Sequence, residues 1–189
     1  MSNNTASNTT FKALVVEETS DGEFKKSIKE RSVSDLPDND LLIKVHYSSL
    51  NYKDAMSASG NKRITKHYPH TPGIDAAGVV VSDKSGTFAE GQKVVVFGYD
   101  LGMDTPGGLG QMISIPADWA IEFPESLTLK EAMIYGTGGL TAALSVQKLE
   151  KMGAKPSDGE VAVTGATGGV GSISIAILKQ LGYEVIAFS

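Results

Sequence analysis

The stretch VAVTGATGGVG, residues 161–171, predicts how the second half of the chain folds. It begins as an apolar run rich in β-forming residues and continues into a glycine-rich turn. Residues 172–178 have the pattern of an amphipathic helix that ends at Leu181-Gly182, and residues 183–188 form a second apolar run. This order predicts a strand, a helix and a second strand, the unit from which a doubly wound α/β sheet is built.

The glycine-rich turn is the most specific functional signal in the sequence. The first N–H groups of a helix have no partner within the helix, so a helix start attracts anions. Glycines let a pyrophosphate approach the backbone, and the turn lies between a strand and a helix, as dinucleotide-binding turns do. Its spacing departs from the strict G-x-G-x-x-G pattern, because Gly165 and Gly168 are three residues apart. The alternative is a tight strand-to-helix turn that binds no ligand.

The end of the second strand indicates the kind of dinucleotide. Sites for NAD usually carry Asp or Glu there, which binds the 2′-hydroxyl of the ribose. This chain has Ala187, Phe188 and Ser189 at that place, and a serine hydroxyl is able to donate to a 2′-phosphate. We therefore predict that the cofactor is NADPH.

The composition excludes several other classes of protein. A chain of 189 residues with 41% hydrophobic and 21% charged residues is typical of a globular protein with a core. The net charge of −5 argues against nucleic acid or an anionic membrane as the partner. The absence of cysteine excludes disulfides, a four-cysteine zinc site and a thiol nucleophile. Since there is no signal-like start and no run of ~18 apolar residues, we expect no membrane span and a cytoplasmic location.

The first two thirds of the chain predict short strands. A strand at 11–17 is followed by a hairpin turn at Asp21-Gly22, and more strand candidates follow, separated by turns rich in Gly and Asp. These candidates are residues 41–47, 77–81, 92–97, 111–115 and 119–121. Many short strands with such turns favour a small barrel or an orthogonal pair of sheets.

The pattern then becomes helical. Thr128 and Glu131 form a capping box, which predicts a helix that begins at Leu129. The segment GTGG at 136–139 is expected to break or bend this helix, and the helical pattern resumes from Leu140 to about Lys151. The sequence therefore predicts an α/β fold with a β-rich part before it.

Residues 48–54, SSLNYKD, place an amide, a tyrosine, an amine and a carboxylate in consecutive positions. The hydroxyl of Tyr52 is able to donate to a substrate carbonyl or to a nicotinamide. Asp54 is suited to cap a helix that begins here. Taken by composition alone, the segment favours a structural loop over a site.

Three other features are better explained by structure than by function. Asp75, in an apolar setting, predicts a buried carboxylate whose partners are backbone N–H groups or a lysine. Residues 107–110, GGLG, predict a flexible loop or a hairpin. His67 and His70 have a spacing found in metal sites, but Pro69 separates them and no third ligand is near, so we expect a surface loop.

Together these segments resemble the medium-chain dehydrogenase/reductase superfamily, and within it the zinc-independent quinone oxidoreductase branch. The likeness is to the YhdH/YhfP subgroup, which includes acrylyl-CoA reductases, and it extends in the family's order from about Phe11 to Ser189. The segments that carry it are SSLNYKD at 48–54, PGID at 72–75, GGL at 107–109, GTGGLTA at 136–142 and VTGATGGVG at 163–171.

The resemblance implies a GroES-like β-barrel followed by the beginning of a doubly wound Rossmann domain. With a disordered polar tail expected over 1–10, the GroES-like catalytic domain spans 11–127, and connecting helices with a partial NADPH-binding Rossmann domain span 128–189. The implied reaction is the NADPH-dependent reduction of an activated carbon–carbon double bond, as in an acrylyl-CoA-like enoyl thioester, or of a quinone. The implied partners are a small-molecule substrate and, in a full-length protein, a second copy in a homodimer.

The resemblance also assigns roles to residues. Tyr52 lies beside the nicotinamide, with Asn51 and Asp54 nearby, and Tyr52 is the candidate donor to the developing enolate charge. The pyrophosphate is held by Thr167, Gly168, Gly169 and Val170, and Ser189 begins the 2′-phosphate site. Zinc-dependent relatives carry their metal ligands where this chain has Asn51-Tyr52 and Gly73-Ile74-Asp75, so the resemblance implies that no metal is bound.

Proteins of this kind continue through the rest of the Rossmann sheet, so we expect this chain to be truncated within that domain. The rival hypothesis is therefore a catalytically inactive fragment that acts as a binding protein or is inert.

Overall fold

The computed structural model describes residues 9–124 and 126–189, and these form two compact units. The first unit ends at Ile134 and the second begins at Tyr135. Residues 1–8 of the predicted tail lie outside the described residues. The prediction that the tail extends to residue 10 is wrong at Thr10, because Thr10 is the first residue of a strand. The domain boundary at 127/128 stays a prediction.

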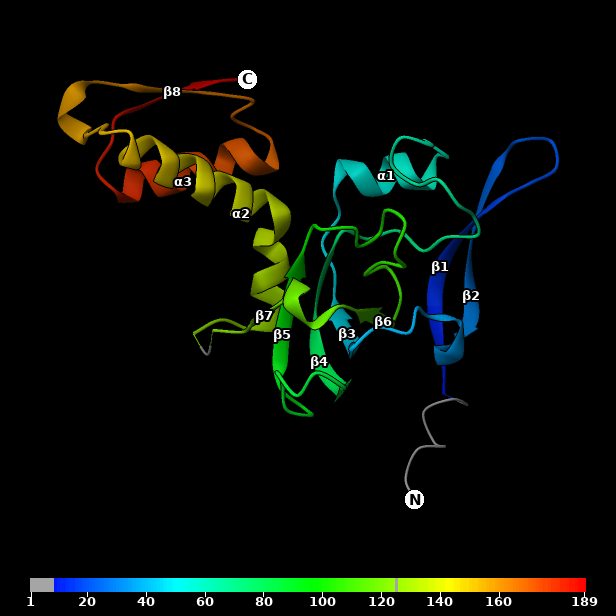
Figure 1. The fold of residues 1–189 in the computed structure, drawn as a ribbon. Coiled ribbons are helices and arrows are strands. Elements are labelled where there is room, and N and C mark those ends of the chain that lie inside the picture. Colours follow the sequence, from blue (N-terminus) through cyan, green and yellow to red (C-terminus); the bar gives the residue numbers. More distant parts are fainter. Residues whose placement is uncertain (1–8, 125) are drawn as a thin grey trace. The chain divides into compact units, whose positions relative to one another are not determined.

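The first unit opens with a β-hairpin (Figure 1, blue). Strand β1 (Thr10–Glu18) pairs antiparallel with β2 (Phe24–Ser32) over its whole length. The predicted turn at Asp21-Gly22 is confirmed, and Gly22 adopts the positive φ of 81° that such a turn needs. The predicted strand at 11–17 is confirmed as the middle of β1.

The sequence analysis missed β2. Its residues, FKKSIKERS, are mostly charged and polar, and Ile28 is 66% exposed. A strand of this composition has no alternating apolar face, so periodicity does not reveal it. Its lysines protect the sheet edge from further pairing.

An antiparallel sheet of five strands forms the rest of the first unit's framework, in the order β6-β3-β4-β5-β7. Each predicted strand is present, although the boundaries differ by a few residues. The strands are β3 (Leu41–Tyr47), β4 (Asp75–Asp83), β5 (Lys93–Phe97), β6 (Met112–Ile115) and β7 (Ala120–Glu122). Isolated bridges join β1 to this framework at Gly110 and His70.

The core of the first unit lies on this sheet. It is built from side chains of β3, β4, β5 and β6 that are almost fully buried, such as Leu41, Ile43, Val96 and Ile113. Burial of a side chain of this size contributes about 1.5–3 kcal/mol. The sheet is therefore a rigid support for the loops at its ends.

Short helical segments connect the strands. Helix α1 (Tyr52–Ala58) follows β3, and 3₁₀ turns occur at η2 (Val33–Asp35) and η3 (Ala117–Trp119). The strand predicted at 119–121 therefore begins one residue later. Trp119 still belongs to the 3₁₀ turn, which follows Pro116, its N-cap residue.

Helix α2 (Leu129–Lys151) begins where the capping box predicts. Thr128 Oγ1 accepts a hydrogen bond from the backbone N–H of Glu131 (3.2 Å), and the Glu131 carboxylate accepts one from the N–H of Thr128 (2.7 Å). The predicted break is confirmed at Gly136, whose φ of 51° and ψ of −156° are not helical. Glycine is the residue that adopts this conformation at low cost.

The second unit contains the predicted strand–helix–strand order. Strand β8 (Val161–Thr164), helix α3 (Gly169–Gln180) and strand β9 (Val185–Phe188) follow one another, with a 3₁₀ turn, η4 (Pro156–Asp158), before β8. β8 and β9 are parallel, with Val161 opposite Val185. The second strand is shorter than predicted because Tyr183 is buried in the core instead, where its hydroxyl donates to the carbonyl of Ala154 (2.9 Å).

None of the helices within 9–124 and 126–189 has the length and apolar character that a membrane crossing requires.

The surface loop predicted around His67 and His70 is only half correct. His67 is exposed, whereas His70 is buried, and its backbone exchanges two hydrogen bonds with Val16 of β1 (2.8 and 2.9 Å). Burial lowers the pKa of His70, against the opposing effects of a backbone hydrogen bond to Gly102 and the charges of Asp104 and Asp100. Among residues 9–124 and 126–189, its Nε2 atom finds no hydrogen-bond partner.

We expect the stability of the first unit to fall as the pH drops below the ordinary histidine pKa of about 6.5. In that range the unfolded chain binds a proton at this position and the folded chain does not, so the free energy of unfolding decreases with falling pH. Urea unfolding of the wild type and of His70→Gln, compared between about pH 5 and pH 7.5, measures this difference. An equally steep decrease in the variant would assign the effect to other groups.

Candidate functional site

The beginning of α1 is fixed by a buried carboxylate. Asn51 is the N-cap residue, and Asp54 Oδ2 accepts a hydrogen bond from its backbone N–H (2.7 Å). The other oxygen, Oδ1, accepts from the N–H of Ile74 (2.9 Å), and Asp54 is only 4% exposed. One side chain thus ties the start of α1 to the segment that leads into β4.

Burial raises the pKa of Asp54, against the lowering effect of the two backbone hydrogen bonds from Asn51 and Ile74. The nearby charge of Asp75 raises it further. Both oxygens are occupied by backbone donors, which favours an anchoring role over contact with a substrate. The capping role that the sequence suggests for Asp54 agrees with this geometry, and a catalytic role stays a prediction.

Asp75 is the centre of a polar network at the start of β4. It is fully buried, and its Oδ2 accepts hydrogen bonds from the Ser49 hydroxyl and from Asn51 Nδ2 (2.9 Å). Asn51 Nδ2 also donates to Ser49 Oγ (3.0 Å). The predicted buried carboxylate is confirmed, but the partners that define this network are side chains of the 48–54 segment. This segment is therefore tied to β4 rather than being an independent loop.

Tyr52 follows this network directly. It is the first residue of α1 and is 81% exposed, while its neighbours Asn51 and Asp54 are fixed by the hydrogen bonds described above. An exposed phenol on a fixed helix start is placed to meet a ligand, and its role beside the nicotinamide stays a prediction. The structure brings Asn51, Tyr52 and Asp54 together with Ser49 and Asp75.

Residues 107–110 form neither a flexible loop nor a simple hairpin, because they are bonded to the segment before β4. The N–H of Gly107 donates to Thr71 (2.7 Å), that of Gly108 to Gly73 (2.8 Å) and that of Leu109 to Pro72 (3.0 Å). A Cβ on Gly108 would lie 2.2 Å from the carbonyl oxygen of Asp75. Glycine is needed at position 108 because the backbone of this segment lies directly against the backbone of Asp75 and leaves no room for a side chain.

Within the described residues, no three or more His, Asp or Glu side chains are grouped so as to hold a metal ion. The predicted absence of a metal requirement stays a prediction.

In the second unit, the glycine-rich turn leaves the start of α3 open. Gly168 is the N-cap residue and provides no side-chain cap. The first N–H groups of α3 therefore have neither a helical partner nor a capping side chain, which is the arrangement that favours an anion. The residues predicted to hold the pyrophosphate, 167–170, are all exposed.

The glycines of this turn have different structural roles. A Cβ on Gly171 would lie 2.2 Å from the carbonyl oxygen of Gly165, so this position keeps the helix close to the strand. A Cβ on Gly169 would have no atom within 4 Å apart from its chain neighbours and the backbone of its own helix. The space over Gly169 is therefore open for a ligand, and the residues present fit a phosphate group.

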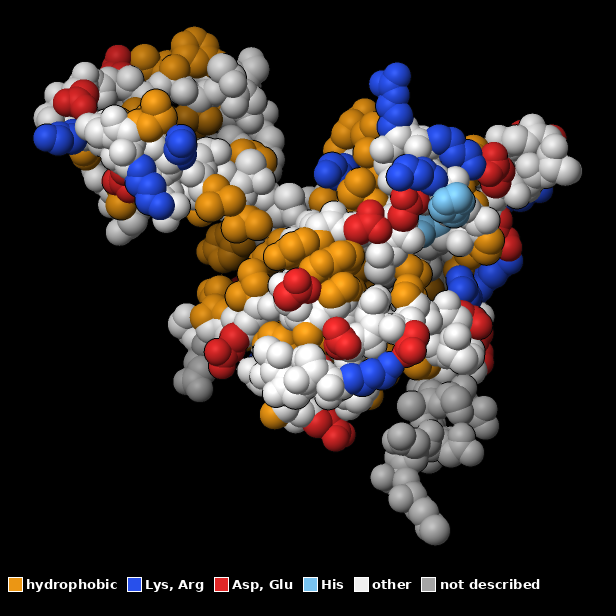
Figure 2. Space-filling model, viewed as in Figure 1, with side chains coloured by type: hydrophobic (Ala, Val, Ile, Leu, Met, Phe, Trp, Pro, Cys, Tyr) orange, Lys and Arg blue, Asp and Glu red, His pale blue; other side chains and the backbone are white. Residues whose placement is uncertain are grey.

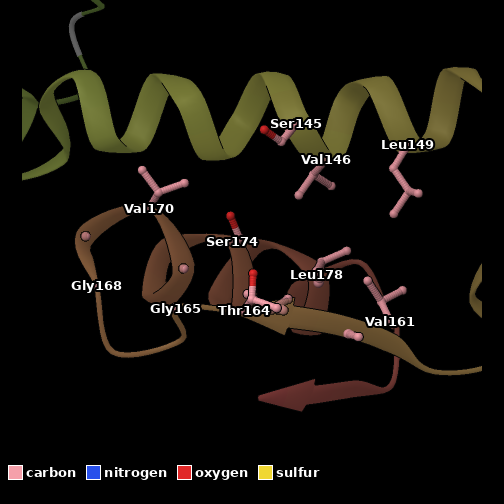
Figure 3. A pocket seen from close by; sticks show the side chains of 14 residues that line it. Ser145, Val146, Leu149, Val161, Thr164, Gly165, Gly168, Val170, Ser174 and Leu178 are labelled. Atoms are coloured by element: carbon pink, nitrogen blue, oxygen red, sulfur yellow. The ribbon is translucent and has the colours of Figure 1, made fainter. Parts of the chain in front are cut away.

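A cavity of about 600 Å³ adjoins the turn. Figure 3 shows Val146 and Leu149 of α2 facing Val170, Ser174 and Leu178 of α3 across it. Side chains of β8 also line it, and Gly165 and Gly168 lie at one end (Figure 3).

At the far end of β9, Ala187, Phe188 and Ser189 are exposed, and no acid lies among them. The contribution of Ser189 to a 2′-phosphate site stays a prediction. Sequence reasoning missed Ser49, although it lies inside the quoted SSLNYKD segment. Only its contact with a residue 26 positions later in the chain shows its role.

Comparison with known proteins agrees with this arrangement. Residues 37–125 match the family described as the alcohol dehydrogenase GroES-like domain. YhfP of Bacillus subtilis is 48% identical over 95% of this chain and 54% of its own length. The acrylyl-CoA reductase AcuI of Ruegeria pomeroyi is 43% identical over 94% of this chain and 54% of its own length.

Solved structures show the same relationship. The YhdH oxidoreductase of Salmonella enterica in complex with NADP has a TM-score of 0.91 at 44% identity, over 94% of this chain and 55% of that one. This chain is a homologue of the YhfP, YhdH and AcuI group of medium-chain dehydrogenase/reductases. The structure of YhfP with NAD bound also has a TM-score of 0.91.

Homology to the YhfP, YhdH and AcuI group confirms the predicted fold class, a GroES-like β-rich domain followed by the first β-α-β unit of a Rossmann sheet. The chain spans about half the length of the curated relatives it matches.

Proposed function

We propose that this chain contributes to an oxidoreductase that uses NADPH to reduce an activated carbon–carbon double bond, as in an acrylyl-CoA-like enoyl thioester, or a quinone. The observation that carries the proposal is the uncapped start of α3 after β8, with open space over Gly169. The relatives named as an acrylyl-CoA reductase and as an oxidoreductase with NADP support it.

The first unit provides the groups that meet the substrate. The cofactor, when bound, supplies a hydride to the β-carbon of the double bond. As negative charge develops on the substrate's carbonyl oxygen, the Tyr52 hydroxyl donates a hydrogen bond to it, and protonation at the α-carbon completes the reduction. Asn51 and Asp54 hold the helix start from which Tyr52 projects.

The second unit provides the groups that bind the dinucleotide. In this proposal Thr167, Gly168, Gly169 and Val170 hold the pyrophosphate through the start of α3, and Ser189 donates to the 2′-phosphate. Independence from zinc, a cytoplasmic location and a homodimer complete the proposal, and the charge of −5 supports a small-molecule substrate over nucleic acid.

We expect NADPH to be preferred over NADH, because residues 187–189 at the end of the second strand include no acid to accept from a ribose 2′-hydroxyl. Steady-state kcat/KM with each cofactor in the natural gene product measures the preference. Equal or better use of NADH would contradict it. This measurement distinguishes NADPH from NADH as the preferred cofactor. The solved relatives do not, because one is in complex with NADP and another has NAD bound.

Gly169→Val tests the phosphate site itself. The new side chain fills space that is open in the folded chain, so the fold should be retained while the pyrophosphate is kept away from the helix start. We expect NADPH affinity to fall at least about tenfold, which corresponds to ~1.4 kcal/mol.

Ala176→Val is the matched control, since it places the same exposed β-branched residue in the same helix, two turns from its start. NADPH titration of both variants separates loss of the site from loss of helix propensity. Unchanged affinity in a folded Gly169→Val protein would mean that the turn binds no phosphate.

A further inference from the structure

Tyr99, in the loop after β5, has a strained backbone. Its φ is +52°, and it is the only non-glycine residue with a positive φ that the structure describes. A bulky side chain rarely adopts this conformation, and it persists only where the surrounding structure imposes it. Residues of this kind gather at functional sites, so the surroundings of Tyr99 are informative.

The loop that carries Tyr99 is anchored on both sides. The N–H of Gly98 donates to the carbonyl of Ile74 (2.9 Å), and the Thr105 hydroxyl donates to Asp100 Oδ2 (3.0 Å). A Cβ on Gly102 would lie 2.5 Å from the backbone of Gly73, so the loop is packed closely on the segment before β4. These anchors hold the backbone of Tyr99 in place without burying its side chain.

In the part of the chain that the structure describes, the Tyr99 ring stacks on one aromatic partner. It lies parallel to the ring of Trp119, with 5.2 Å between the centroids and 5° between the planes. Tyr99 is nevertheless 61% exposed, whereas Trp119 is partly buried. Because a parallel stack covers one face of a ring, the exposure of Tyr99 belongs mainly to its opposite face.

This aromatic pair lies at the same end of the sheet as the candidate active site. Phe97, at the end of β5, is paired with Asp75, and Val96 is paired with Ala120, which follows Trp119. Asp75 in turn binds Asn51, the residue before Tyr52. The loop after β5, the segment before β7 and the start of β4 are thus neighbours within the first unit.

We propose that the open face of Tyr99, backed by Trp119, is a subsite that stacks a planar ring of the substrate. The proposal rests on the proposed reductase function and deepens it by naming the chemistry of the ligand, a flat π-system. Such a ring is present in a quinone and in the adenine of a coenzyme A thioester. A ring that is already fixed loses little freedom on binding, and an open aromatic face attracts a second ring.

Trp119 makes the subsite measurable, because it is the single tryptophan of the chain. Its fluorescence is followed while the whole chain is titrated with a soluble naphthoquinone and, separately, with coenzyme A. We expect a saturable change in the wild type and in Tyr99→Phe. In Tyr99→Gly, which relaxes the backbone and removes the ring, the affinity should fall at least about tenfold.

Tyr135→Leu is the control, because it removes another exposed aromatic ring, 51% exposed and outside the stack, and should bind as the wild type does. Far-UV circular dichroism confirms that each variant is folded. Saturation by the naphthoquinone identifies a quinone ring as the ligand, and saturation by coenzyme A alone identifies adenine; both support the subsite.

Unchanged affinity in Tyr99→Gly, or a change without saturation for both ligands in the wild type, would overturn the proposal. NADPH consumption is measured separately in the natural gene product. Consumption without ring binding overturns the subsite alone. Ring binding without consumption overturns the reductase function alone.

Discussion

Gly108→Ala is expected to destabilise the first unit by about 3 kcal/mol or more, because the added methyl group meets backbone that has no room to move. Its Cβ would lie 2.2 Å from the carbonyl oxygen of Asp75 and 2.9 Å from Ser48 Oγ. Ser48 donates to that same carbonyl (2.8 Å), so the clash also disturbs the start of β4. Figure 2 shows hydrophobic side chains exposed on the visible surface, and unfolding would expose more of them.

Chemical denaturation followed by the fluorescence of Trp119 measures this loss, since the single tryptophan lies in the first unit. Gly169→Ala, in the second unit, is the control for the added methyl group, and its unfolding is followed by far-UV circular dichroism. It adds the same methyl group at a glycine with no atom within 4 Å of the new Cβ, so the unfolding midpoint should stay unchanged. A Gly108→Ala protein as stable as the wild type would show that residues 107–110 are free to move away from β4.

Tyr52→Phe is expected to lower kcat about 100-fold, which is the usual effect of removing a hydrogen-bond donor to a developing oxyanion. The change keeps the aromatic ring and removes only the hydroxyl of a residue that is 81% exposed, so the fold should not respond. KM for NADPH should change little, because the variant keeps the ring that we propose packs beside the nicotinamide. Steady-state kinetics with an enoyl thioester in the natural gene product measure both constants.

Tyr135→Phe removes the hydroxyl of another exposed tyrosine, 51% exposed and outside the site, and should leave kcat unchanged. If kcat of Tyr52→Phe falls by less than about threefold, Tyr52 is a cofactor contact and the donor lies elsewhere. This outcome would not bear on the proposal that the turn of the second unit binds phosphate.

Features that depend on neighbouring residues could be predicted from the sequence. The turn at 165–171 is encoded by glycines between an apolar run and a helical pattern, and the capping box at Thr128 and Glu131 marks the start of α2. The kink at Gly136 follows from glycine's access to unusual backbone angles. Strand β2 was not predicted, because it is held by pairing with β1 and has no apolar face that the sequence pattern could reveal.

The sequence by itself thus determined the fold class, the order of most elements and the place of the glycine-rich turn between β8 and α3, because each rests on local propensity and periodicity. Tertiary structure alone decided which side chains meet. It brought Ser49 and Asn51 to Asp75, buried His70 beside β1, packed residues 107–110 against β4 and stacked Tyr99 on Trp119. These contacts join residues far apart in the chain, and their energy depends on burial and backbone approach, which no local pattern of residues records.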